Sequence, residues 1–143
     1  MAVELDHSFD TGKPTEETWE MILDLDRVIP AVEGGKVVER TSPTSAKAEI
    51  AVKMGAMSMT FAGTVDVTER DDAAHRAVLQ VKSREAGGAG YANANVTFQL
   101  ADGGGTVHTS AQISGKAASM GEGVMVTVLD ALIENFTERL KTA

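Results

Sequence analysis

The side chains best suited to acid–base or metal chemistry stand singly along this sequence rather than in groups. Its three histidines are His7, His75 and His108, and their positions show no spacing typical of ligands to one metal ion. A metal centre or a general base needs several such groups that converge on one point. We therefore expect these histidines to lie on the surface or in ordinary packing contacts, and we predict no metal site.

Nucleophiles and carboxylates lead to the same expectation. No cysteine is present, which excludes thiol nucleophiles and disulfides, and no G-x-S-x-G pattern marks a serine nucleophile. Neighbouring acidic side chains stand beside predicted turns or in the first turn of a predicted helix, where solvated carboxylates are usual: Glu16, Glu17, Asp24, Asp26, Asp71 and Asp72. The sequence therefore predicts no catalytic residues and a protein that is not an enzyme.

The balance of charge argues against nucleic acid as a partner. The chain has 13 Lys and Arg against 21 Asp and Glu, a formal net charge of -8, and its basic residues are dispersed. Phosphate backbones would be repelled on average. The amino-terminal residues do not resemble a signal peptide, and no stretch has the roughly 18 apolar residues of a membrane span. We therefore expect a cytoplasmic protein.

The most unusual pattern is a face of flexible apolar side chains. In the stretch KMGAMSMTFAG, residues 53–63, a strand would place Met57, Met59, Phe61 and Gly63 on the same face. Methionine fills irregular gaps in any core, so ordinary packing is one interpretation. Flexible methionines also suit the wall of a pocket for a long, bendable apolar molecule. The sequence leaves both interpretations open.

A strand and a short helix begin the chain, and a long run of strands follows. After a first strand at 3–10, Pro14 and the two glutamates behind it predict a helix that packs through Trp19. From Gly34 to about Lys116, apolar residues recur at every second position, which is typical of an antiparallel meander of six or so strands. Tight turns are expected where glycines break the alternation, at Gly55-Ala56 and at Asp102 to Gly105.

The last segment is the most periodic one. Apolar residues recur there at intervals of three and four, and Ser119 with Glu122 forms a capping-box pattern. This predicts an amphipathic helix of about six turns from Met120 to Leu140, which has to pack against the sheet. The predicted fold class is α+β, a curved antiparallel sheet wrapped around a long C-terminal helix, in a single domain of residues 1–143.

This order of elements resembles the helix-grip fold of the START-like (SRPBCC) superfamily. Three stretches carry a closer resemblance: MGAMSMTFAGTVDVTERD at 54–71, GGAGYANANVTFQL at 87–100 and SGKAASMGEGVM at 114–125. Taken in order, they are similar to the CoxG family of carbon monoxide dehydrogenase gene clusters. The resemblance implies an accessory protein of an aerobic molybdenum-type carbon monoxide dehydrogenase rather than one of its catalytic chains.

The fold that the resemblance implies often leaves a cavity between its sheet and its last helix. Small residues that face the helix, Gly63, Ala92 and Ala94, would enlarge it. Tyr91 is the candidate for a polar contact with a carbonyl head group. The predicted ligand-binding wall consists of Met57, Met59, Phe61, Val65, Leu79, Tyr91, Ala94, Val96, Phe98, Met125, Val128, Leu132 and Phe136.

A respiratory quinone such as menaquinone is the ligand we expect, because a soluble carbon monoxide dehydrogenase has to pass electrons to an acceptor dissolved in the membrane. Such a carrier would couple the enzyme to the membrane electron-transport chain. The expected partners are therefore carbon monoxide dehydrogenase, an apolar quinone or lipid, and the inner face of the cell membrane in a transient peripheral contact. We expect no intrinsic cofactor.

Two other functions stay open. The first is a structural adaptor for membrane recruitment or maturation of carbon monoxide dehydrogenase, without ligand carriage. The second is an enzyme of the cyclase or aromatase kind, which this fold also supports. The sequence offers no obvious inward set of acid, base or metal ligands for that second function.

Overall fold

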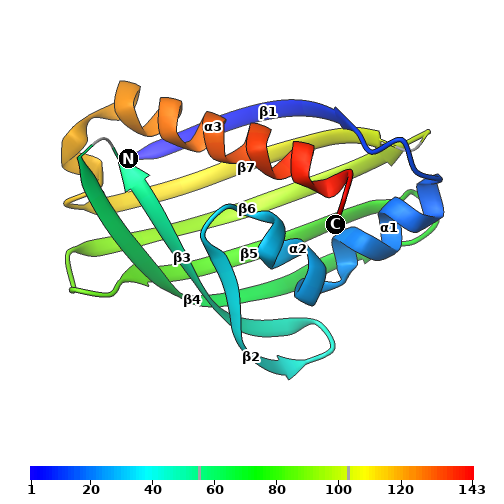
Figure 1. Cartoon of the computed structure of the whole chain (residues 1–143), viewed down its shortest axis with the longest axis horizontal. Helices are drawn as coiled ribbons and strands as arrows, with labels where there is room; N and C mark the ends of the chain where they lie inside the picture. The colour runs from blue at the N-terminus through cyan, green and yellow to red at the C-terminus, as the bar shows by residue number, and fades with distance from the viewer. Residues whose placement is uncertain (55, 103) are drawn as a thin grey trace.

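Alternating apolar residues produce a seven-stranded antiparallel sheet in the order β1-β7-β6-β5-β4-β3-β2 (Figure 1). The computed structural model describes residues 1–54, 56–102 and 104–143. The strands are β1 (Ala2–Asp10), β2 (Gly35–Ser42), β3 (Ser45–Met54), β4 (Met57–Asp71), β5 (Arg76–Glu85), β6 (Gly90–Ala101) and β7 (Gly104–Gly115). The predicted run of antiparallel strands is therefore confirmed.

The sheet brings the first strand next to the last one. Leu5 of β1 lies opposite Thr109 of β7, whereas the other neighbours in the sheet are consecutive strands. The β3 and β4 strands pair as far as Met54 opposite Met57, as expected for a hairpin. Gly55 and Gly103, at which two of the tight turns are predicted, lie outside the described residues.

Three α-helices and a short 3-10 helix complete the described part of the chain: α1 (Thr15–Leu23), α2 (Leu25–Ala31), η1 (Ala118–Met120) and α3 (Glu122–Leu140). Helix α3 crosses the concave side of the sheet, runs beside β1 and meets α2 near its C-terminal end (Figure 1). This arrangement is the predicted α+β helix-grip fold. No helix in the residues that the structure describes is both long and apolar enough to cross a membrane.

The predicted capping box at the start of α3 is wrong. The helix begins after Gly121, whose φ of 96° favours glycine, and no side chain of the described residues caps it. Ser119 lies in η1 instead, where its Oγ donates a hydrogen bond to the carbonyl oxygen of Lys116 at 2.5 Å. The capping motif fails because the intervening glycine lets the chain turn between Ser119 and the helix.

The buried residues form two clusters. The larger one lies beneath α1, α2 and the C-terminal turns of α3, and we call it the packed end; its largest members include Trp19, Met21, Ile22, Leu25, Phe98, Phe136 and Leu140. The smaller one includes the inner faces of β3 and β4 near their hairpin and the start of α3, and we call it the hairpin end: Val3, Val52, Met59, Phe61, Ala111, Ile113, Ala117 and Met125.

Polar contacts fix α3 against its neighbours at two places. Midway along the helix, Oδ1 of Asp130 lies 2.6 Å from Nε2 of His7 on β1. Three residues after the helix ends, the carbonyl oxygen of Ala143 accepts hydrogen bonds from Nζ of Lys13 at 3.1 Å and from Nη2 of Arg27 at 3.0 Å. The position of α3 over the sheet is thus set by side chains from β1, α2 and the loop after β1.

Candidate functional site: an apolar cavity beneath helix α3

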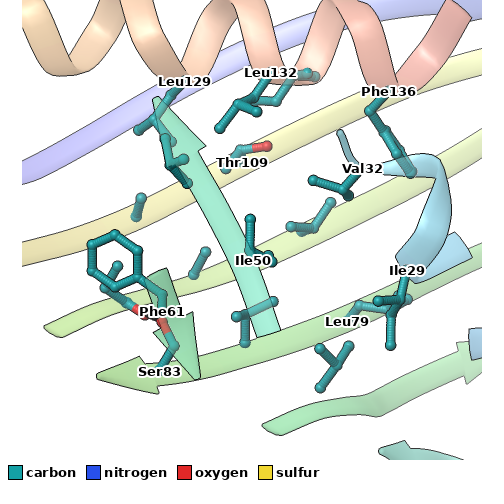
Figure 2. A pocket seen from close by; sticks show the side chains of 18 of the residues that line it. Ile29, Val32, Ile50, Phe61, Leu79, Ser83, Thr109, Leu129, Leu132 and Phe136 are labelled. Atoms are coloured by element: carbon teal, nitrogen blue, oxygen red, sulfur yellow. Dashed lines mark hydrogen bonds between the residues drawn. The ribbon is translucent and has the colours of Figure 1, made fainter. Parts of the chain in front are cut away.

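Residues of both clusters line a cavity of about 230 Å³ between the sheet and helix α3 (Figure 2). The sheet supplies Ala48, Ile50, Val52, Phe61, Val65, Leu79, Val81, Ser83, Ala92, Ala94, Val96, Phe98, Val107, Thr109, Ala111 and Ile113. The helices and the residue that follows α2 supply Val28, Ile29, Val32, Met125, Val128, Leu129, Leu132, Ile133 and Phe136. Among the described lining side chains, all but those of Ser83 and Thr109 are apolar.

The two periodicities of the sequence place these side chains on the wall. Strand residues two apart share a face, so Val107, Thr109 and Ala111 of β7 all point into the cavity. Helix residues three or four apart share a face, so Val128 and Leu132 of α3 point down onto the same space. The cavity therefore lies where the inner face of the sheet and the apolar stripe of α3 meet without filling the gap.

Most of the predicted wall lies on this cavity. The structure brings together Phe61, Val65, Leu79, Ala94, Val96, Phe98, Met125, Val128, Leu132 and Phe136. Ala92 also lines the cavity, so two of the three small residues expected to enlarge it do lie there. Their role in holding a ligand stays a prediction.

The two methionines that make the sequence unusual do not lie on the cavity wall. Met59 is buried in the hairpin end and Met57 packs against it while partly exposed, and neither lines the cavity. Gly63 is also absent from the wall. A Cβ at Gly63 would lie 1.8 Å from the carbonyl oxygen of Lys82, so glycine serves there to let β4 and β5 approach closely.

Tyr91 does not lie on the cavity wall, contrary to its expected role. It is 38% exposed and borders a separate depression on the outer face of the sheet, together with Lys82, Arg84 and Asn93. The reason is the strand period, since Tyr91 has the opposite parity to Ala92 and therefore points away from α3. A head group inside the cavity would have to meet another polar side chain.

Several residues that line the cavity are not among those predicted from the sequence. Val28, Ile29 and Val32 come from α2 and the residue after it, and their apolar spacing is a usable signal for a helix face. Thr109 stands at an inward-facing position of its strand. A single polar residue within an apolar alternation is the signal that could identify it.

The two polar lining residues differ in their hydrogen bonding. The Oγ of Ser83 donates to the carbonyl oxygen of Ala92 at 2.5 Å. The Oγ1 of Thr109 is buried and has no hydrogen-bond partner among the described residues. None of the described lining side chains is titratable, so the cavity offers neither charge nor a proton donor of tunable pKa.

The titratable groups with a shifted pKa lie elsewhere. Hydrogen bonds from Arg70 and then Trp19 lower the pKa of Asp72 on the exposed surface. A hydrogen bond to Asp6 is the largest cause that raises the pKa of His108, and Glu4 contributes as well. Both groups are outside the cavity, so these shifts concern the surface rather than the site.

One group of titratable side chains has the spacing of metal ligands. Ligand atoms of His7, Asp130 and Glu134 lie within 4.8 Å of one another. The Nε2 of His7 is already engaged by Asp130, however, and Glu134 is exposed. We interpret this group as a link between β1 and α3, and the absence of a metal site stays a prediction.

The family model for the G subunit of carbon monoxide dehydrogenase (CoxG) matches residues 8–143. No curated protein matches the chain in sequence.

Solved structures with the same fold cover nearly the whole chain. A conserved protein from Geobacillus kaustophilus is 20% identical, with a TM-score of 0.76 over 99% of this chain and 90% of that one. The Zhui aromatase/cyclase from Streptomyces sp. R1128 is 11% identical, with a TM-score of 0.61 over 99% and 92%. Major latex-like protein 151 from Panax ginseng is 9% identical, with a TM-score of 0.59 over 99% and 95%. At these identities the likeness concerns the fold.

Proposed function

The chain belongs to the CoxG family of carbon monoxide dehydrogenase, and from this premise we propose that it carries an apolar ligand in the cavity beneath α3. Family membership implies association with carbon monoxide dehydrogenase. The ligand we propose is a respiratory quinone such as menaquinone, delivered between the membrane and the enzyme. The observation that carries this proposal is the cavity itself, about 230 Å³ in volume and lined almost wholly by apolar side chains.

A cavity of this kind favours an apolar guest over water. Protein interiors normally pack as densely as organic crystals, so unfilled space of this size costs stability. An apolar cavity of roughly 150 Å³ stays dry and takes up benzene, because water finds too few hydrogen-bonding partners in it. The cavity beneath α3 is larger than that, and the described residues of its wall offer two hydroxyl groups.

The proposed work is transfer rather than catalysis. Each apolar CH₂ group moved out of water gains about 0.8 kcal/mol, so an isoprenoid chain leaves the membrane only for another apolar site. A quinone held beneath α3 could reach the dehydrogenase and accept two electrons and two protons there, in the overall reaction CO + H₂O + quinone → CO₂ + quinol. The redox chemistry belongs to the dehydrogenase and the quinone.

A catalytic role for this chain is less favoured. Cyclase chemistry on the same fold would need an acid or base in contact with the substrate. No described lining residue is titratable, and the nearest hydroxyls belong to Ser83 and Thr109. We therefore propose that the protein is not an enzyme.

Native mass spectrometry of protein purified from an aerobic bacterial host, followed by organic extraction, tests the proposal. We expect a bound quinone or other neutral lipid in stoichiometric amount. Protein that is purified empty and stays empty after incubation with menaquinone and with ubiquinone would contradict ligand carriage and leave the adaptor function in its place.

A matched pair of variants ties uptake to the cavity. Ala94→Trp places an indole inside the cavity and should abolish uptake, whereas Asn95→Trp places it on the outer face of the same strand and should not. If Ala94→Trp removes the ligand but carbon monoxide oxidation still couples to membranes, the protein acts as an adaptor. Circular dichroism of both variants checks that they remain folded.

A further inference from the structure

One hydroxyl group inside the cavity has no hydrogen-bond partner among the described residues. Thr109 is 6% exposed and lines the cavity from β7, and its Oγ1 is the unpaired atom. Figure 2 shows this oxygen among the apolar side chains of the wall. A hydroxyl that gives up its bonds to water and receives none in return destabilises the folded state.

Other buried or half-buried hydroxyls among the described residues do have hydrogen-bond partners. At the packed end, the Oγ1 atoms of Thr11 and Thr18 lie 2.7 Å apart and bond to each other. On the cavity wall, Ser83 Oγ donates to the carbonyl oxygen of Ala92. Unlike these hydroxyls, the hydroxyl of Thr109 has no hydrogen-bond partner among the described residues. It lies in the cavity that we propose as the ligand site.

Neither water nor packing accounts for the hydroxyl of Thr109. A buried water needs two to four polar partners, and the other hydroxyl among the described wall residues is already bonded. A valine would fill the same volume, as Val107 does two residues earlier on the same face of β7. Valine would therefore provide the same side-chain shape without an unpaired oxygen.

We propose that Thr109 is the anchor for the polar group of the ligand. Its Oγ1 donates a hydrogen bond to a carbonyl oxygen, or exchanges one with a hydroxyl group, of a neutral molecule whose remaining atoms contact the apolar wall. This inference rests on the proposed function and gives Thr109 the role that the sequence suggested for Tyr91. The polar head group of the ligand and its apolar carbon atoms then both lie in the cavity.

The wall also restricts the charge of the ligand. No described lining residue carries a positive charge, so an ionised carboxylate or phosphate beside Thr109 would be buried without a counter-ion. A single hydroxyl donor compensates a neutral carbonyl but not a full charge. The ligand class is therefore a neutral ketone, quinone or alcohol, in preference to a fatty acid anion.

Two probes with the same carbon frame test the anchor: menadione, which carries carbonyl groups, and 2-methylnaphthalene, which does not. Equilibrium dialysis measures the affinity of each for the wild-type protein and for Thr109→Val. Because a neutral hydrogen bond contributes about twofold to tenfold in affinity, Thr109→Val should weaken menadione binding by a factor in that range. It should leave 2-methylnaphthalene binding unchanged.

Three further variants separate the hydroxyl from its surroundings. Thr109→Ser keeps the hydroxyl and should retain most of the preference for menadione. Thr109→Ala removes it in case valine perturbs the strand. Thr106→Val makes the same chemical change at an exposed position of the same strand and should alter neither affinity.

The possible results distinguish this inference from the function on which it rests. If the wild-type protein binds neither probe, ligand carriage and the anchor are both wrong. If it binds both and Thr109→Val changes neither affinity, the anchor is wrong while carriage stands. An equal loss for both probes would mean that Thr109 acts through packing alone, which also overturns the anchor.

Discussion

Helix α3 crosses two regions that differ in how completely they are filled. At the packed end, Leu140 of α3 and Met21 of α1 are 0% exposed, and neither lines the cavity. In the middle of the same helix, Leu129 and Leu132 are only partly buried and line the cavity. Both regions belong to one amphipathic stripe, so apolar periodicity alone does not determine whether a helix face is packed or left facing a cavity.

The difference lies in what faces the helix. Helices α1 and α2 bring large buried side chains such as Trp19 and Leu25, respectively, to the packed end. In the middle, the inner face of β6 presents the small side chains of Ala92 and Ala94, which line the cavity. A firmly packed end can therefore hold the helix in place while the middle stays hollow, which is compatible with the ligand carriage proposed above.

Two leucine truncations on α3 give the largest expected contrast. Leu140→Ala should lower the free energy of unfolding by about 2–5 kcal/mol, because it opens a new cavity among fully buried neighbours. Leu132→Ala only enlarges an existing cavity and should cost about 1–2 kcal/mol. Urea denaturation monitored by circular dichroism measures both values. Equal losses would show that the cavity wall is packed as firmly as the end.

Alanine-to-valine substitutions on two neighbouring strands should change the stability of the protein in opposite directions. Ala77 is 0% exposed at the packed end, so Ala77→Val should overpack it and cost about 1–3 kcal/mol. Ala94→Val fills part of the cavity and should stabilise the ligand-free protein by about 0.5–2 kcal/mol. Thermal melts of protein stripped of lipid measure both. A destabilising Ala94→Val would mean that the cavity has no room for a methyl group.

A change of pH should alter the free energy of unfolding slightly and leave the affinity for a neutral ligand unchanged. This effect should be smaller than those of the leucine and alanine substitutions. The raised pKa of His108 means that its interaction with Asp6 and Glu4 stabilises the fold fully below the unfolded pKa near 6.5 and is lost as pH rises through the folded value. Because the side chain of His108 is 42% exposed, screening by solvent reduces the effect. Binding of a neutral probe should not change over this range.

Chemical denaturation of the wild type and of His108→Gln between pH 5.5 and 8.5 checks this expectation. The wild type should lose a little stability relative to the variant as the pH rises, and a gain instead would reverse the assigned role of the ion pairs. Dialysis of menadione at the same pH values checks the affinity, and a clear pH dependence would place a titratable group in contact with the ligand.

The strands and the long helix could be predicted because their periodicities are simple. Period-two alternation follows from the pleat of a strand, and residues such as Leu79, Val96 and Phe98 could be assigned to the inner face from it. Tyr91 was assignable to the outer face by the same rule, because it stands one residue before Ala92. The role predicted for Tyr91 is therefore wrong for a reason that the sequence itself contains.

Other features required three-dimensional information. Met57 and Met59 have the parity of Phe61, yet the cavity ends before it reaches them, and no sequence pattern marks how far along a strand a cavity extends. The contribution of α2 depends on how that helix docks against the sheet. The unpaired oxygen of Thr109 could be recognised only once its described neighbours were known.

The pairing of β1 with β7 also constrains how the protein is made. Ala2 lies opposite Gln112, so the first strand acquires its neighbour in the sheet only after β7 has left the ribosome. Closing so long a loop costs entropy before the new contacts repay it, and folds rich in distant pairings are slow to form. During synthesis, the meander from β2 to β6 can assemble first. Until β7 is available, the backbone hydrogen-bonding groups of β1 remain unpaired and exposed to water or to a chaperone.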